Sequence, residues 1–240
     1  AGTLVLNGEG SASASGVFDV DAGATLQFDS DYSVADAAGL TGGGAFDLTG
    51  GTLHIDGVIS TDFLQDGGNI DGSFEIDGEF GWADGSWSTT NPSATTVIKS
   101  DGVLYIEDTT SFYENRDITN YGTVNWTGGT LLTNANGSFV NFGSFNDQSD
   151  SDHNLSETSG DSTFTNDGTY LKTGAGTTRI DQTFDNGSPV TLDVRNGVLE
   201  LNGGGTNGSS GAVVVKNDGL IRFTDNYTIE NAANLSTESL

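Results

Sequence analysis

A glycine followed by alternating apolar residues recurs along the whole chain and constrains its fold more than any other feature. The template is Gly-x-Φ-x-Φ, where Φ is a large apolar residue, as in Gly102-Val-Leu104-Tyr-Ile106. Apolar residues at every second position are typical of a β-strand with one buried face. A strand unit that recurs at a roughly fixed period indicates a solenoid, in which each coil packs on the next. The ten copies begin at Gly2, Gly23, Gly51, Gly72, Gly102, Gly122, Gly143, Gly168, Gly197 and Gly219.

The intervals between these glycines fall into two groups. Five of the nine are short and nearly equal, such as those from Gly102 to Gly122 and from Gly122 to Gly143, and four are longer. Loops inserted on a coil of constant length would produce this distribution. We therefore expect each glycine to occupy the same corner of its coil, and any specific function to lie in the longer intervals. These cover residues 24–50, 73–101, 144–167 and 169–196.

Many of the glycines follow a second short apolar element that ends in Asn or Asp. Examples are Phe139-Val-Asn141-Phe-Gly143 and Val215-Lys-Asn217-Asp-Gly219. Asn, Asp and Gly tolerate the left-handed backbone that a sharp corner requires. Each unit therefore predicts a strand, a corner, a second strand and a loop.

These patterns predict an all-β fold, a right-handed parallel β-solenoid (β-helix) of about ten rungs that would span roughly 48 Å. The alternative is an antiparallel β-sandwich, because Asn-Gly and Asp-Gly between strands also mark hairpins. We expect residues 1–240 to form a single solenoid domain. The chain lacks an initial Met and opens inside a repeat, so we expect it to be an excerpt of a longer repeat protein.

The charge of the chain excludes several kinds of partner. Thirty-four acidic and 7 basic residues give a net charge of −27. Such a surface repels nucleic acid and anionic membranes, because both are bound through Lys and Arg. No apolar run approaches the length of a membrane span, so we expect no membrane insertion. The chain has no cysteine, which excludes disulfides and thiolate metal sites.

Several segments resemble the repeats of a known group of proteins. They are Gly-Thr-Leu-Val-Leu-Asn-Gly at 2–8, Thr-Gly-Gly-Thr-Leu at 49–53 and 127–131, and Phe-Thr-Asn-Asp-Gly-Thr at 164–169. These are similar to repeats of bacterial β-helical surface proteins, namely autotransporter passengers and filamentous-haemagglutinin-like adhesins. The resemblance implies a secreted or cell-surface protein that works in adhesion, a matrix or a filament, and it implies no catalytic residues.

No catalytic site is predicted. Polysaccharide lyases on β-helices use a basic residue near carboxylates, and hydrolases use clustered carboxylates with a nearby His. No Asp-Asp pair, which such hydrolases often use, occurs. We expect both histidines, His54 and His153, to be surface residues, and the seven basic side chains to be solvated and directed outward. Those seven are Lys99, Arg116, Lys172, Arg179, Arg195, Lys216 and Arg222.

The best candidate for a metal site is the acidic segment from Asp147 to Asn154. Asp147, Asp150 and Asp152 offer carboxylate oxygens at short spacing, and calcium binds six to eight oxygen ligands. The segment lacks the spacing of an EF-hand, and a disordered acidic loop is the other interpretation. Calcium is thus the only cofactor that the sequence indicates. The repeats at Gly143 and Gly168 have lost their second apolar residue, so we also expect the solenoid to be least regular here.

The candidate ligand-binding residues are Trp82 and Trp87, which lie in a Gly-rich stretch. Two tryptophans could form a platform for sugar rings, although packing in the core is the more frequent role of tryptophan. Together these features predict a structural or interaction segment of an extracellular or cell-surface bacterial protein. Its partners would be other copies of itself or surface glycans. The alternatives are a glycan-binding adhesin or tailspike-like module that uses Trp82 and Trp87, and a polysaccharide lyase or hydrolase.

Overall fold

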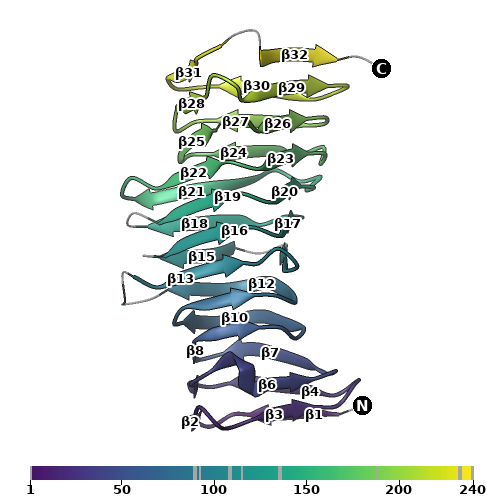
Figure 1. The fold of residues 1–240 in the computed structure, drawn as a ribbon, viewed down its shortest axis with the longest axis vertical. Helices are drawn as coiled ribbons and strands as arrows, with labels where there is room; N and C mark the ends of the chain where they lie inside the picture. The colour runs from purple at the N-terminus through teal and green to yellow at the C-terminus, as the bar shows by residue number, and fades with distance from the viewer. Residues whose placement is uncertain are drawn as a thin grey trace.

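The computed structural model is a stack of short parallel strands that coils through about ten turns. It describes residues 2–88, 91, 93–107, 110–114, 116–134, 137–187, 189–231 and 234–238. The turns lie one above another, and the two ends of the chain lie at opposite ends of the stack (Figure 1). The predicted β-solenoid is therefore confirmed. All the described strand pairings between turns are parallel, so the antiparallel sandwich is excluded.

Each turn contributes strands to three columns that run along the stack. The first column contains β1 (Thr3–Leu6), β4 (Thr25–Asp29), β7 (Ala45–Gly50), the first parts of β10 (Phe63–Asp71) and β12 (Glu79–Ser88), β14 (Val103–Ile106), β17 (Thr123–Trp126), β20 (Ser144–Asp147), β23 (Thr169–Lys172), β26 (Thr191–Val194), β29 (Ala212–Lys216) and β32 (Leu235–Glu238).

The second column follows the first along the chain, up to β30. It contains β2 (Gly10–Ala12), β5 (Tyr32–Val34), β8 (Thr52–Ile55), the later parts of β10 and β12, β15 (Thr110–Glu114), β18 (Thr130–Asn134), β21 (His153–Ser159), β24 (Thr177–Ile180), β27 (Val198–Leu201) and β30 (Leu220–Phe223).

The third column completes the turn. It contains β9 (Gly57–Ile59), β11 (Phe74–Ile76), β13 (Thr95–Ile98), β16 (Asp117–Asn120), β19 (Ser138–Asn141), β22 (Thr163–Asn166), β25 (Thr183–Asn186), β28 (Gly205–Asn207) and β31 (Tyr227–Ile229). In the first turns its place is taken by the pair β3 (Phe18–Val20) and β6 (Leu40–Gly42), with a short 3-10 helix, η1 (Ala37–Gly39). No helix in the described part of the chain is long and apolar enough to cross a membrane.

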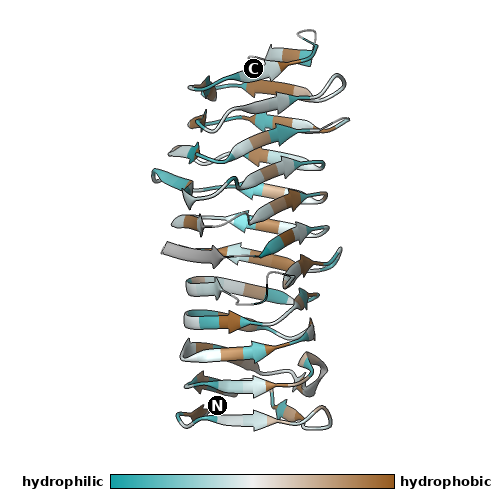
Figure 2. Ribbon diagram, turned by 90° about the vertical axis from the view of Figure 1, so that its left-hand side faces the viewer, coloured by the Kyte–Doolittle hydropathy of each residue, from teal (hydrophilic) through white to brown (hydrophobic). Residues whose placement is uncertain are grey.

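The core fills the inside of the coil because alternate side chains of every strand point inward. In β17, Val124 and Trp126 are buried, whereas Thr123 and Asn125 are half-buried on the other face. Figure 2 shows hydrophobic and hydrophilic residues interleaved along the strands of successive turns. Aromatic side chains stack from turn to turn, and the rings of Phe139 and Phe164 lie parallel with centroids 5.0 Å apart.

The prediction that every repeat glycine marks the same corner is wrong. Gly168 precedes β23 in the first column, whereas Gly197 precedes β27 in the second and Gly72 precedes β11 in the third. Three of the four long intervals therefore span a full turn plus one further column, whereas the interval from Gly143 to Gly168 is a single long turn. The described part of the interval 73–101 contains β11, β12 and β13 and is mostly strand.

The turns of the coil differ in length. Phe46 pairs with Phe63, and Phe63 in turn pairs with Phe80, so these two turns are short. Phe145 pairs with Tyr170, so the turn that contains the acidic segment is longer. All four residues of β20 nevertheless pair in unbroken register with β23, so the expected loss of regularity is absent from this column.

Close approach between turns explains why glycine recurs at the corner before the first column. A Cβ atom on Gly143 would lie 2.2 Å from the carbonyl oxygen of Gly122, and one on Gly168 would lie 2.3 Å from that of Gly143. Neither glycine has a positive φ. Steric space between stacked turns, rather than a left-handed backbone, therefore requires glycine at this corner. Gly51 has a φ of 68°, so at that position glycine is required by a left-handed backbone, as the sequence predicts.

Candidate functional site: a buried polar cluster at Asp147

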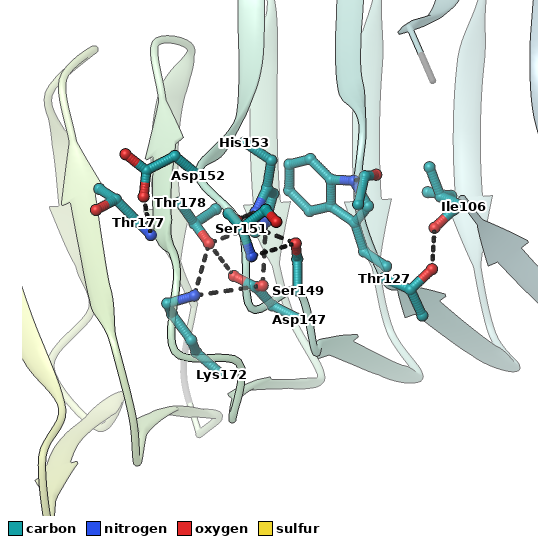
Figure 3. Close-up of polar contacts among 12 residues, drawn as sticks. Ile106, Thr127, Asp147, Ser149, Ser151, Asp152, His153, Lys172, Thr177 and Thr178 are labelled. Carbon is teal, nitrogen blue, oxygen red and sulfur yellow. Dashed lines mark hydrogen bonds and ion pairs between the residues drawn. The ribbon is translucent and has the colours of Figure 1, made fainter. Parts of the chain in front are cut away.

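Two adjacent turns carry polar residues on the inner side of the corner between the first and second columns. Asp147 ends β20, and its register partner Lys172 ends β23 in the next turn. His153 begins β21, and its register partner Thr178 lies in β24. Parallel register places both pairs one strand spacing apart. The four side chains therefore form a square inside the coil, which we call the Asp147 cluster (Figure 3).

The carboxylate of Asp147 is the centre of this cluster. Its Oδ2 accepts hydrogen bonds from the Tyr170 hydroxyl, at 2.9 Å, and from the Thr178 hydroxyl. Its Oδ1 lies 3.1 Å from Nε2 of His153 and 3.5 Å from Nζ of Lys172. Lys172 Nζ also donates to Thr178 Oγ1 at 2.9 Å. Both carboxylate oxygens thus have two polar neighbours.

Both ring nitrogens of His153 lie within hydrogen-bond distance of an oxygen atom. Nδ1 lies 2.9 Å from the carbonyl oxygen of Ser151, which can only accept. Nε2 lies 3.0 Å from Thr178 Oγ1, whose own hydrogen is donated to Asp147. Contacts at both ring nitrogens thus fix the orientation of the imidazole, with Nε2 facing the carboxylate of Asp147.

The cluster lies away from solvent. The exposed fractions of the side chains of Asp147 and Lys172 are 0%, and that of His153 is 1%. The ring of Trp126, from the preceding turn, packs against His153 with centroids 4.3 Å apart. Val194, the register partner of Lys172 in the following turn, is fully buried. The ionic groups are thus enclosed between apolar side chains on both sides.

Burial and pairing act in opposite directions on the acid and the base. Burial raises the pKa of the Asp147 carboxyl, but His153, Lys172 and Thr178 outweigh burial and hold that pKa below its ordinary value. Burial lowers the pKa of the Lys172 ammonium, and the attraction of Asp147 only partly offsets this. Burial and the nearby carboxylate raise the pKa of the Tyr170 hydroxyl, which keeps its hydrogen.

The three carboxylates considered for calcium do not converge. Asp147 points into the coil, whereas Asp150 and Asp152 lie on its outside and accept backbone N–H groups of the next turn. Asp150 accepts from Ala175 at 3.0 Å, and Asp152 from Thr177 at 2.8 Å. Across the described ranges, no group of three or more potential ligand side chains is placed to hold a metal ion. The segment is thus tied to its neighbouring turn through these hydrogen bonds.

Trp82 and Trp87 both lie in the core, with exposed fractions of 1% and 0%. Their rings stack at 3.9 Å with an interplanar angle of 7°. Trp87 Nε1 donates to Gln65 Oε1 at 2.7 Å. Inside the coil these indoles present no face to a sugar ring, so they do not form the surface platform considered from the sequence.

Three expectations about charged side chains are wrong. His153 is buried rather than a surface residue, and Lys172 and Arg116 are not solvated. Arg116 Nη2 donates to the carbonyl oxygen of Gly72 at 2.7 Å, and its guanidinium lies over the ring of Phe74. Burial lowers the pKa of Arg116 to about 10. His54 is half-exposed between Asp56 and Asp71, as a surface histidine should be.

A second set of buried polar residues runs along the corner between the third and first columns. Five asparagines end consecutive strands of the third column, and the side-chain amide of each of the first four donates to the amide oxygen of the next, at 2.7 to 2.8 Å. All five are fully buried. We call this set the asparagine ladder, and its members are Asn120, Asn141, Asn166, Asn186 and Asn207.

The sequence pattern includes the first three of these asparagines but predicts only left-handed corners for them. The more informative signal is Phe-x-Asn at Phe139-Asn141, Phe164-Asn166 and Phe184-Asn186, spaced by one turn. A polar residue that recurs at the same inward position in successive turns must hydrogen-bond to a copy of itself. The asparagine amide can do so, because it has both a donor and an acceptor.

The chain has no match in comparisons with known proteins: no family model, no curated protein and no solved structure matches it.

Proposed function

We propose that this chain is a structural rod of an extracellular or cell-surface protein, and that its outer surface contacts other copies of itself or surface glycans. The observation that carries the proposal is the asparagine ladder. Four amide–amide hydrogen bonds join five consecutive turns inside the core. The same amides also bond to backbone of the next turn, since Asn141 Nδ2 donates to the carbonyl oxygen of Thr169. Such a ladder resists separation of turns along the axis.

The outer face of the second column adds a similar longitudinal series of ion pairs. Arg179 lies 3.7 Å from Asp152 on one side and 3.0 Å from Glu200 on the other, measured between nitrogen and oxygen. Arg222 pairs with the same Glu200 at 2.7 Å. Exposed pairs contribute little to stability one by one, but a connected series adds to the cohesion of the turns.

The placement of the ionisable cluster favours a rod over a polysaccharide-active enzyme. A catalytic carboxylate must reach the bond that it cleaves. The Asp147 cluster is enclosed in the core, and a polymeric substrate could reach it only if turns separated. Trp82 and Trp87 are likewise enclosed, so they do not support the glycan-binding alternative.

Two measurements test this proposal. Antibodies against the chain should label unpermeabilised cells of the producing organism, and mild protease added to those cells should remove the label. Single-molecule pulling along the axis should show a high unfolding force that falls in Asn141→Ala and is retained in Asn125→Ala, where the amide lies outside the core. Label found only after permeabilisation, or equal forces for both variants, would contradict the proposal. New reducing ends or unsaturated products from acidic or neutral polysaccharides would favour the enzyme instead.

A further inference from the structure

The Asp147 cluster brings a primary amine and a carboxyl group together in an enclosed site. Lys172 Nζ lies 3.5 Å from Asp147 Oδ1, and both side chains are fully buried. Their strands pair in register, so backbone hydrogen bonds hold the two residues opposite each other. Lys172 Nζ also donates to Thr178 Oγ1, which limits the positions that the amine can take. Such fixed proximity raises the effective concentration of reacting groups.

The residues around the Asp147 carboxylate are placed to assist the addition of a nucleophile to its carbon, Cγ. The hydroxyls of Tyr170 and Thr178 both donate to Oδ2, where negative charge would develop when a nucleophile adds to Cγ. Nε2 of His153 lies 3.1 Å from Oδ1, a distance at which a proton can pass between the two atoms. The two oxygens of one carboxylate thus have different roles available to them.

We propose that Lys172 and Asp147 condense into an intramolecular amide that covalently joins two turns of the solenoid. This inference goes beyond the proposed rod function and does not depend on it. It rests on the register of β20 with β23, on the burial of both side chains and on the donors around Asp147.

The reaction needs no oxidant, reductant or second substrate. Lys172 first passes one proton to Asp147 Oδ1, which leaves a neutral amine and a carboxylic acid. The nitrogen lone pair then forms a bond to Cγ, and the electron pair of the C=O bond moves onto Oδ2, where Tyr170 and Thr178 stabilise it. His153 protonates the departing Oδ1 hydroxyl, the Cγ–Oδ1 bond breaks, and the C=Oδ2 bond forms again. The nitrogen returns a proton to His153, so the net products are one amide and one water.

Burial favours the amide over the ion pair. Charged groups carry a large desolvation cost in a dry interior, and their mutual attraction seldom compensates for it fully. The reaction replaces an ammonium and a carboxylate with one neutral group that can keep the hydrogen bonds to Oδ2. Because Trp126 and Val194 enclose the site, water has poor access for the reverse hydrolysis.

Tryptic peptide mapping of the unfolded full chain tests the proposal directly. No Lys or Arg lies between Asp117 and Leu171, so trypsin releases residues 117–172 from an unlinked chain. Amide formation blocks cleavage after Lys172, and the peptide then extends to Arg179. The linked chain should therefore yield peptide 117–179, lighter than its sequence by one water, and fragmentation should place the link between Asp147 and Lys172. Peptide 117–172 at full mass, with no extended form, would overturn the proposal.

A cyclic imide at an Asp-Gly pair is the other way to lose one water, and Asp167-Gly168 lies within the same peptide. An imide leaves Lys172 open to trypsin and is cleaved by hydroxylamine, whereas the amide blocks trypsin and resists hydroxylamine. Lys172→Arg is the matched variant, because it keeps a buried cation but cannot form this amide. Its peptide should end at position 172 with full mass. Loss of water that persists in Lys172→Arg would assign the loss to the imide and overturn the proposal. The map of the wild-type chain decides the question even if the variant fails to fold.

Discussion

The asparagine ladder and the Asp147 cluster satisfy buried polar side chains in different ways. Both place polar side chains at inward positions that a neighbouring turn fills with an apolar residue, Ile98 opposite Asn120 and Trp126 opposite Asp147. The ladder repeats one neutral residue through five turns, and each inner amide donates to the asparagine of the next turn and accepts from that of the turn before. The cluster uses different, charged residues in only two turns. A self-complementary group can be extended from turn to turn, whereas an ionic group needs a dedicated partner and stays local.

Breaking one partner of the Asp147 cluster should have the largest effect. Lys172→Met leaves the Asp147 carboxylate buried without its ammonium partner. We expect a loss of about 3–5 kcal/mol in the free energy of unfolding, because removing one partner of a buried ion pair is costly. Urea denaturation followed by tryptophan fluorescence measures this loss, since Trp126 lies beside the cluster.

The double variant Asp147→Leu/Lys172→Met serves as the control for that experiment. Removal of both charges should recover most of the loss, because apolar residues of similar volume are tolerated where a buried ion pair stood. A Lys172→Met variant as stable as the wild type would show that the cluster is not a coupled unit.

Breaking the ladder in its middle should have an intermediate effect. Asn141→Ala removes the acceptor of Asn120 and the donor to Asn166, and leaves buried amide groups without a partner. We expect a loss of about 2–3 kcal/mol in the free energy of unfolding, again from urea denaturation.

Asn125→Ala is the matched control for the ladder. Asn125 also accepts an amide from the next turn, Asn146, at 3.0 Å, but this pair lies on the outer face. Water can replace the lost hydrogen bond there, so the change should stay within about 0.5 kcal/mol. Equal losses for the two variants would mean that burial of the ladder contributes nothing.

The smallest effect should come from the exposed carboxylate next to the cluster. The hydrogen bonds from Thr177, with help from Arg179, hold the pKa of Asp152 below its ordinary value. A carboxyl group with a lowered folded-state pKa adds stability above its unfolded-state pKa, and that stability is lost as the pH falls through the folded-state pKa. Acid should thus release Asp152 from the Thr177 amide, while the neutral asparagine ladder keeps its hydrogen bonds.

An NMR titration tests this difference. The Asp152 carboxyl carbon and the Thr177 amide should shift together at a pH below the ordinary aspartate range, and the Asn141 side-chain amide should not shift. In Asp152→Asn the Thr177 amide should lose its pH dependence. An Asp152 pKa at or above its ordinary value would contradict the structure at this corner.

Much of the fold can be predicted from the alternation of apolar residues. The spacing of Val124 and Trp126 after Gly122 predicts that both point inward, and they do. Two positions of the Asp147 cluster can also be recognised in the sequence. The repeats at Gly143 and Gly168 lack a second apolar residue, and the residues at those positions are Asp147 and Lys172. This loss by itself indicates only irregularity, because sequence alone does not show that the two residues are register partners.

The roles of individual side chains are harder to predict, since they depend on contacts between turns. His153 follows an Asp/Ser-rich stretch typical of a surface loop, but its strand carries it under Trp126. Trp82 and Trp87 belong to a Gly-rich segment, but both halves of β12 pair with neighbouring turns and direct the indoles inward. The ladder shows in the sequence only as the recurring Phe-x-Asn, because a single Asn-containing corner does not reveal which residue it pairs with in the next turn.

The sequence by itself determined that this chain forms short strands, that alternate residues point inward and that similar units stack. These properties follow from local spacing, which sets the face on which each side chain lies. Only the tertiary structure decided which units lie opposite each other, because the turns differ in length and the glycines mark more than one corner. Register between turns brings Asp147 within reach of Lys172 and joins the asparagines into a ladder. Both depend on the hydrogen bonding of strands far apart in the chain.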